Sequence, residues 1–330
     1  MHFGRQVITT NEREITYENV VSVLQSAMIV HLQNASDIET LIKIESGDLI
    51  WDRTKTYRAD IDHKYASGIP HQATDFKRGF CWGNPITLVQ NGNVEDKNLV
   101  DAIAELNDCY DSDNAKVKNQ IIGRFVEICG VCNEYIDLND EYEDGDIYFT
   151  TTALDPRTSF VVYSSYYVDK RPMMGVTYRY DDLTQTYYFT CITKKSRFEI
   201  VNMTKIVNGT KVEREDLWQH DFRSGEKNPF GIINIVEWIR DDDRMGCFER
   251  AIPAIREMAY AIADFNNDVD QNTQSIWFSV DLDLGKDEDG NDISTFHSGD
   301  LVRAYSSESG KPSLQPISVN YDYNGMLEHF

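Results

Sequence analysis

The longest uninterrupted helical pattern in the sequence starts at Met245. From there to Val269, apolar side chains mostly recur every three or four residues, a spacing that places them on one face of an α-helix. Pro253 leaves two alternatives open: the main helix begins there with the proline in its first turn, or a kink separates a short helix from a longer one. After Gln274 the pattern alternates as in strands, with an acidic tip over residues 285–292. Any fold for this chain must therefore join one long helix to a small β-rich region.

Upstream of this helix, helical and strand-like patterns occupy separate stretches. Residues 12–47 have helical spacing with polar breaks, which predicts two short helices, and residues 97–134 return to helical spacing with a break at Asp111–Asn114. Gly83-Asn84-Pro85 ends one element, and Ile86–Val89 begins an extended one. Residues 146–200 alternate as about five strands separated by turn signals, and the charged residues 211–227 predict a loop. The fold class that follows is α+β, with an antiparallel sheet packed on the preceding helices.

Composition narrows the classes of protein that fit. The chain has 330 residues, of which 41% are hydrophobic, and a formal net charge of −23. It can bury one large core or two to three smaller ones, and its acidity opposes tight neutralisation of nucleic-acid phosphates. Its apolar runs fall far short of the roughly 20 residues of a membrane span, and its start lacks an apolar signal core. We expect a soluble, unsecreted protein that holds any nucleic acid loosely.

Six cysteines are sparse and irregularly spaced, which suits buried thiols in a reducing compartment better than a disulfide framework. Cys129-Gly-Val-Cys132 falls inside the helical pattern of residues 97–134 and has no second C-x-x-C pair. Because a structural zinc ion takes four ligands, we interpret this motif as structural rather than as a zinc or redox site.

Other candidate chemistry is weak. In residues 309–313 a lysine suggests a phosphate-binding loop, but Pro312 stands where Ser or Thr would bind magnesium, and the seven histidines lack metal-ligand spacing. The aspartates of residues 281–292 suit calcium, but Gly285 stands where an EF-hand loop needs Asp, so a solvated loop tip is favoured. For Asp60, Asp62 and His63 a structural role is favoured over a catalytic one. We expect no enzyme activity, cofactor or metal, and ATP hydrolysis should belong to a partner.

Three paired motifs follow one another along the chain. They are Lys55-Thr-Tyr-Arg-Ala-Asp-Ile-Asp62 with Gly79-Phe-Cys-Trp-Gly-Asn-Pro-Ile86, then Ser159-Phe-Val-Val-Tyr163 with Arg171-Pro-Met-Met-Gly-Val-Thr-Tyr-Arg179, and then, most specifically, Asn228-Pro-Phe-Gly-Ile-Ile-Asn-Ile-Val-Glu237 with Gly246-Cys-Phe-Glu-Arg-Ala-Ile-Pro-Ala-Ile255. From about residue 45 to its end, the chain resembles the portal proteins of long-tailed bacteriophages of Gram-positive hosts. Asn234 stands where that family usually has Pro, and Cys247 replaces an Asp; we expect both departures to affect local packing only.

The resemblance implies a portal fold. Its parts would be a wing of helices and antiparallel sheet over residues 1–245, a first stem helix over 246–273, a small β-rich clip over 274–318 and the start of a second stem helix over 319–330. The family continues into a channel loop, a long helix and a crown, which we expect to be absent from a truncated or shortened relative. The resemblance also implies a ring of twelve identical subunits at one capsid vertex, through which viral dsDNA is packaged and ejected.

The resemblance implies partners as well. These are the terminase large subunit as packaging motor, the head-to-tail connector protein, the major capsid and scaffolding proteins, and dsDNA that passes without sequence specificity; no membrane is implied. The protein would act in the virion, at the portal vertex, after assembly in the host cytoplasm. By analogy the clip docks the motor and the connector, with Asp287, Asp289, Arg303 and Lys311 as candidate docking residues.

A ring that passes DNA must avoid gripping it, because each contact between a lysine and a phosphate would have to be broken at every step. The polar face of the helix over 246–273 is mostly negative, and an acidic lumen repels phosphates. The candidate channel-lining residues are Glu249, Arg256, Glu257, Asp264 and Asp268. An ordinary solvated helix face is the alternative.

Two other functions stay open from the sequence. A nucleic-acid-processing enzyme could hold magnesium on the aspartate clusters, and it predicts Mg-dependent cleavage by the pure protein. A non-ring virion adaptor or tail component of α+β fold would stay monomeric.

Overall fold

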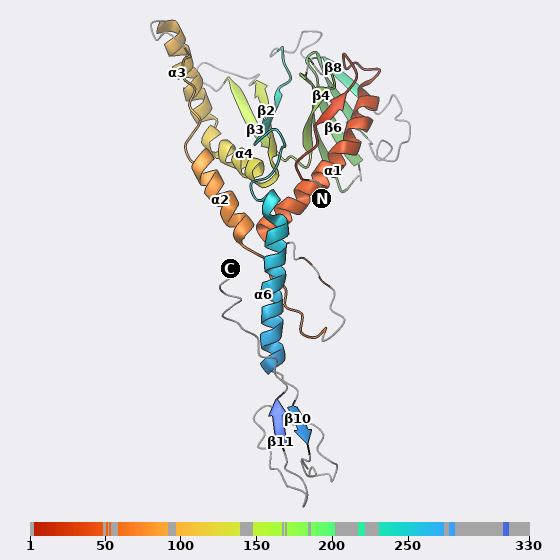
Figure 1. Ribbon diagram of the computed structural model, residues 1–330. Helices are drawn as coiled ribbons and strands as arrows, with labels where there is room; N and C mark the ends of the chain where they lie inside the picture. Colours follow the sequence, from red (N-terminus) through yellow and green to blue (C-terminus); the bar gives the residue numbers. More distant parts are fainter. Residues whose placement is uncertain are drawn as a thin grey trace, which may run out of the picture. The chain divides into compact units, whose positions relative to one another are not determined.

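The computed structural model describes residues 3–48, 51, 53, 59–91, 97–138, 148–166, 168, 170–183, 186–201, 217–221, 231–273, 277–280 and 313–316. The chain divides into two compact units (Figure 1). Unit 1 comprises Met1–Trp51 and Ala66–Arg256, and unit 2 comprises Asp52–Tyr65 and Glu257–Phe330. Residues 52–65, which we expected to fold with the N-terminal 245 residues, belong instead with the helix that continues after Arg256.

Unit 1 contains two sheets. The larger has the strand order β1-β4-β5-β6-β7-β8, in which β1 pairs parallel with β4 and the other pairs are antiparallel. The smaller is antiparallel with the order β3-β2-β9. The strands are β1 (Ile8–Thr10), β2 (Val131–Leu138), β3 (Phe149–Leu154), β4 (Ser159–Ser164), β5 (Pro172–Asp181), β6 (Thr186–Ile192), β7 (Ser196–Val201), β8 (Leu217–Asp221) and β9 (Ile235–Ile239).

Helices form the outer layers of unit 1. They are α1 (Val20–Ser46), α2 (Ile69–Trp82), α3 (Lys97–Ser112) and α4 (Ala115–Cys129). Alternate residues of β4–β7 share a core with the N-terminal half of α1, as Phe189 does with Leu24, while the other face of this sheet packs on the smaller sheet through Val161 and Ile235. The far face of the smaller sheet is covered by α4 and by Trp82 of α2. The layers therefore run from the N-terminal half of α1 through the large sheet and the small sheet to α4 with α2, while the C-terminal half of α1 packs on α4 and α2.

The 27-residue helix α1 replaces the two short helices that the polar breaks predicted. Polar residues inside the helix, His31 and Asn34 among them, are buried and hydrogen-bonded, so they do not end it. His31 Nε2 lies 3.0 Å from the backbone oxygen of Arg157, and Asn34 accepts from the Gln6 amide at 3.0 Å and donates to its carbonyl at 2.8 Å. Gly47 ends the helix in the left-handed conformation.

The helices found in residues 97–134 end earlier than the sequence pattern predicted. The break between α3 and α4 is confirmed, with Asn114 in the left-handed conformation at φ 56°, but α4 ends at Cys129 and β2 begins at Val131. Gly130, at φ 80°, makes this turn, and a Cβ there would lie 2.3 Å from the backbone of Arg244. The C-x-x-C motif therefore spans the end of a helix and the start of a strand, and our placement of it inside a helix was wrong.

The five strands expected in residues 146–200 are confirmed, but they do not all belong to one sheet. β4 to β7 form the expected antiparallel meander, whereas β3 belongs to the small sheet. The segment 211–227, predicted as a loop, contains β8, which pairs with β7. Gly83 ends α2 as expected, but Ile86–Val89 forms no strand within the described residues; the backbone of Leu88 bonds instead to the side chain of Asn107.

Unit 2 contains most of α6 (Ile252–Thr273) and a two-stranded antiparallel sheet of β10 (Trp277–Val280) and β11 (Ser313–Pro316). The strand predicted after Gln274 is confirmed by β10. The strand expected around residues 301–305 and the helix start expected in residues 319–330 lie outside the described residues. Across the described part of the chain, no helix is both long and apolar enough to cross a membrane.

Candidate functional site

The long helix α6 begins at Ile252, directly after a short 3-10 helix of residues Glu249–Ala251. Pro253 is its second residue, where a missing backbone N–H costs nothing because the first-turn amides have no partner within the helix. Of the two alternatives, the structure shows the one with Pro253 in the first turn. The helix therefore starts six residues later than residue 246, where we expected it, since a loop and the 3-10 helix occupy 246–251.

The carboxylate of Glu249 fixes the chain just before α6. It is fully buried, at 0% exposure. Oε1 accepts from the Gly4 amide at 2.7 Å and pairs with Arg5 Nη2 at 2.5 Å, and Oε2 accepts from the Gly246 amide at 2.9 Å. One side chain thus joins the N-terminal segment to the loop that leads into the helix.

Close backbone contacts support the same junction. The Cys247 amide donates to the backbone carbonyl of Glu127, near the end of α4, at 2.7 Å. A Cβ on Gly246 would lie 2.0 Å from the carbonyl oxygen of Ile128. Phe248 is buried in a cluster with residues of α1, α4 and β2. The Gly-x-Phe-Glu motif of residues 246–249 therefore has a local physical purpose: glycine permits the approach, phenylalanine fills the core, and glutamate holds the N-terminal segment.

Glu249 was a candidate channel-lining residue, and the structure contradicts that prediction because the carboxylate is buried and paired. Glu249 lies four residues after Met245, on the apolar side of the helical pattern, which is the signal that could have indicated burial. Its partner Arg5 carried no signal in the sequence. Arg256 and Glu257 are exposed, and Asp264 and Asp268 are half-buried on α6; whether these four face a channel stays a prediction.

Within unit 2, residues 59–65 run against α6. The side of the helix that carries Ala259, Ala263 and Asn267 is buried, and small residues four apart allow close approach of another segment. The amide of His63 donates to Asn267 Oδ1 at 2.7 Å, and Ile61 is buried. Within the first paired motif, residues 61–63 therefore contact this helix, and a structural role for Asp60, Asp62 and His63 stays a prediction.

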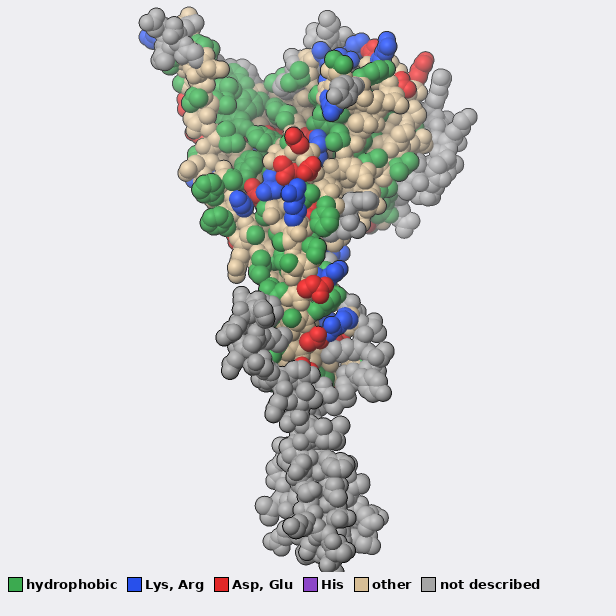
Figure 2. Space-filling view, in the orientation of Figure 1, with side chains coloured by type: hydrophobic (Ala, Val, Ile, Leu, Met, Phe, Trp, Pro, Cys, Tyr) green, Lys and Arg blue, Asp and Glu red, His purple; other side chains and the backbone are tan. Residues whose placement is uncertain are grey.

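Two carboxylates of α6 meet basic side chains that precede it in the chain, Arg53 and His63, both in unit 2. Asp264 forms an ion pair with Arg53, whose guanidinium also lies 5.2 Å from the centre of the Tyr260 ring. Asp270 lies 2.5 Å from His63 Nε2, an ion pair when the imidazole is protonated. Figure 2 shows acidic and basic side chains next to one another on the described surface of unit 2. The negative charge predicted for this helix is therefore partly compensated.

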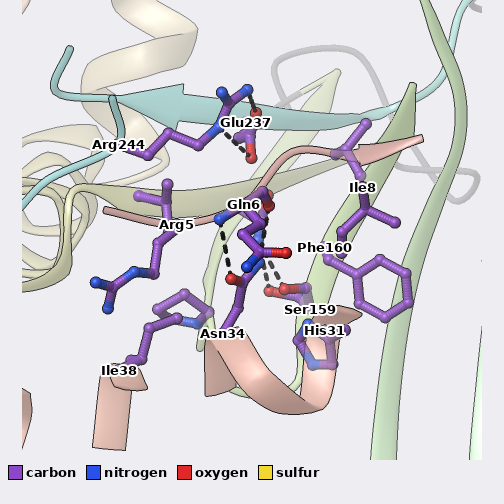
Figure 3. Close-up of a pocket in the computed structure, with 14 residues that line it drawn as sticks. Arg5, Gln6, Ile8, His31, Asn34, Ile38, Ser159, Phe160, Glu237 and Arg244 are labelled. Carbon is purple, nitrogen blue, oxygen red and sulfur yellow. Dashed lines mark hydrogen bonds and ion pairs between the residues drawn. The ribbon is translucent and has the colours of Figure 1, made fainter. Parts of the chain in front are cut away.

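A small cavity in unit 1 lies beside the N-terminal segment (Figure 3). Its volume of about 20 Å³ is the size of one water molecule. It is lined by Arg5, Gln6, Asn34 and Ser159 among others, and Figure 3 shows the Asn34 amide paired with Gln6 at its edge. The cavity is too small for a ligand, so it has no place in a binding site.

The C-x-x-C cysteines are buried thiols rather than a reactive pair. Burial raises the pKa of Cys129 to about 12 and raises the pKa of Cys132 still further, so neither is a thiolate at neutral pH. No group of three or more His, Cys, Asp or Glu residues among those described could hold a metal ion.

We predict that a maleimide labels the folded subunit quickly at the exposed Cys81 and leaves Cys129 and Cys132 unmodified. Access favours Cys81, whereas burial and a raised pKa protect Cys129 and Cys132. Mass spectrometry of digested protein would locate the label, with the urea-unfolded chain as the fully labelled control. Rapid labelling at Cys129 or Cys132 would show that the motif is chemically active.

The described residues thus combine a two-sheet unit, in which the long helix α6 starts, with a second unit that contains most of α6 and the β10–β11 pair. The family model described as "Phage portal protein, SPP1 Gp6-like" matches residues 25–330. The chain therefore belongs to this family of phage portal proteins, and the match begins earlier than the resemblance we drew from residue 45. None of the curated proteins compared with the chain matches it.

Membership of this family implies a general role, a location and interactions. Portal proteins are structural rather than enzymatic and belong to the virion, at the portal vertex of the capsid. The family implies an oligomeric ring and interactions with the capsid and the terminase. Of the candidate docking residues, Asp287, Asp289, Arg303 and Lys311 all lie outside the described residues.

Proposed function

We propose that the chain is the subunit of a twelve-membered ring whose central channel passes viral dsDNA during packaging and ejection. Unit 1 would be the wing, α6 the first stem helix, and the region that contains β10 and β11 the clip that docks the terminase motor and later the head-to-tail connector. The observation that carries this proposal is α6 itself: a 22-residue helix, about 33 Å long at 1.5 Å per residue, held at its start by Glu249 and followed by the β10–β11 pair.

The charges of α6 support a channel that does not grip DNA. Glu257 and Asp268 provide carboxylates that repel phosphates, and the cation Arg53 is already engaged by Asp264. A lysine or arginine paired with a carboxylate releases fewer counterions on meeting a phosphate, so it binds DNA less strongly. We propose Arg256, Glu257, Asp264 and Asp268 as lining residues, without Glu249.

The oligomeric state tests the proposal most directly. We expect native mass spectrometry of the purified chain to show a closed oligomer of twelve subunits, and negative-stain images to show rings with a central hole. Both should be recorded over a hundredfold range of protein concentration, because ring closure depends on mass action.

A protein that stays monomeric across that range would contradict the ring and favour the adaptor alternative. Incubation with linear duplex DNA, with magnesium and with EDTA in parallel, tests the enzyme alternative. Cleavage that requires magnesium would contradict a purely structural role.

A further inference from the structure

The exposed side of α1 carries no charge over most of its length. Residues 20–36 contain no Asp, Glu, Lys or Arg, although charged residues make up 26% of the chain. The exposed positions there are Ser22, Ser26, Ile29, Leu32, Gln33 and Ser36. Ile29 is 76% exposed at the centre of this side. A solvent-facing helix surface normally carries charges, so this surface, the α1 face, is unusual.

A second uncharged feature lies on α2. Phe76 and Phe80 are 70% and 80% exposed, and their rings stack with centres 6.4 Å apart. Thr74 and Trp82, two residues away from them, face the interior of unit 1. Since two residues correspond to about 200° around a helix, Phe76 and Phe80 point outward. The nearby Asp75 is paired with Arg78 at 3.0 Å. We name these two rings the α2 face.

The two faces lie at opposite ends of the layers of unit 1. The N-terminal half of α1, which carries the α1 face, covers the outer face of the large sheet, and α2 lies with α4 beyond the small sheet. Figure 1 shows the two helices diverging on either side of the sheets. A twofold dimer would use one self-complementary patch, whereas two different patches on opposite sides suit the repeated contact of a ring.

Charge favours another copy of the chain as the occupant of these faces. Each subunit carries a formal net charge of −23, so neighbouring copies repel one another wherever their surfaces present acidic groups. Contact is least costly between surfaces without uncompensated carboxylates, and both faces meet that condition. We propose that the α2 face of one subunit packs on the α1 face of the next, which deepens the proposed function and rests on it.

Cross-linking tests the pairing. In a Cys81→Ser background, which removes the exposed thiol beside Phe80, the double variant Ile29→Cys/Phe80→Cys should give a ladder of covalent oligomers with a short bismaleimide. Each single cysteine variant should stay largely at the monomer band, because equal positions in a ring do not meet. The control is Ile29→Cys/Leu183→Cys, since Leu183 is apolar and 96% exposed in the turn between β5 and β6; it should give no ladder.

A second measurement places a charge in the α2 face and follows the association constant. Phe80→Lys should lower the association constant at least tenfold, as measured by mass photometry, while Leu183→Lys leaves it unchanged; both substitutions are at the surface, so circular dichroism should match wild type. If wild type forms rings but the double cysteine variant gives no ladder, the pairing is wrong and the ring stands. If wild type never forms rings, the proposed function fails and the pairing fails with it.

Discussion

Replacing Glu249 with alanine should lower the free energy of unfolding of unit 1 by about 3–5 kcal/mol, because it leaves the buried Arg5 guanidinium without this carboxylate. The Gly4 and Gly246 amides lose an acceptor at the same time, and an unsatisfied buried donor adds to the cost. Urea unfolding followed by circular dichroism would measure the change. We also expect weaker ring assembly, since α6 loses its anchor.

Matched variants separate what the charge of Glu249 contributes to the free energy of unfolding from what its hydrogen bonds contribute. Glu249→Gln keeps the shape and one acceptor oxygen, so it should cost less than alanine. The double variant Arg5→Met/Glu249→Gln should cost less than the sum of its single changes, because each single change leaves a buried group uncompensated. Asp242→Ala, an exposed change in the neighbouring loop, should stay within about 0.5 kcal/mol of wild type. Equal effects for Asp242 and Glu249 would rule out the anchor.

Periodicity in the sequence located the elements but not their ends or partners. The spacing of apolar residues found β4 to β7, which pair with one another in chain order. It could not assign β3 to the small sheet, since the start of its partner β2 fell in the stretch predicted as helical, and β9, which pairs with β2, is distant in the chain. It divided α1 in two at the polar residues between Leu32 and Ile38, although one of them, Asn34, is satisfied by Gln6 from a segment distant in sequence.

The same lack of information about distant partners explains what the sequence missed at the candidate site. The polar face of α6 was correctly found to be acidic, but charge compensation depends on segments that fold back from far away. Arg53 is separated from Asp264 by more than 200 residues, and Arg5 is still farther from Glu249. Helical spacing shows on which side of a helix a carboxylate lies, and it contains no information about the cation that meets it. The family resemblance rested on the order of the motifs. The structure adds a physical reason for one of them, the Gly-x-Phe-Glu sequence of residues 246–249 that fixes the chain before α6.

The buried imidazole of His31 should make the protein less stable in mild acid. Its ring stacks on Phe160 with centres 4.3 Å apart, and Nε2 donates to the backbone oxygen of Arg157. Burial lowers the pKa of His31 from 6.5 to about 4. Between these values the unfolded chain binds a proton that the folded chain does not, so the free energy of unfolding rises with pH across this window and is fully recovered above it.

At pH 5 the loss relative to pH 8 should be about 2 kcal/mol from this one group, from 1.36 kcal/mol per pKa unit. Glu39, whose pKa is lowered by its hydrogen bond to Arg157, loses its stabilising effect below its ordinary value of 4.5, so measurement between pH 5 and 8 largely avoids it. His31→Gln keeps an amide donor but cannot titrate in this range. Urea unfolding of both proteins at pH 5 and pH 8 isolates the effect, because other groups, including Glu134 with its raised pKa, are common to both. Parallel pH dependences in wild type and variant would mean that His31 takes up its proton without unfolding, and that its pocket is more accessible to water than the packing against Phe160 implies.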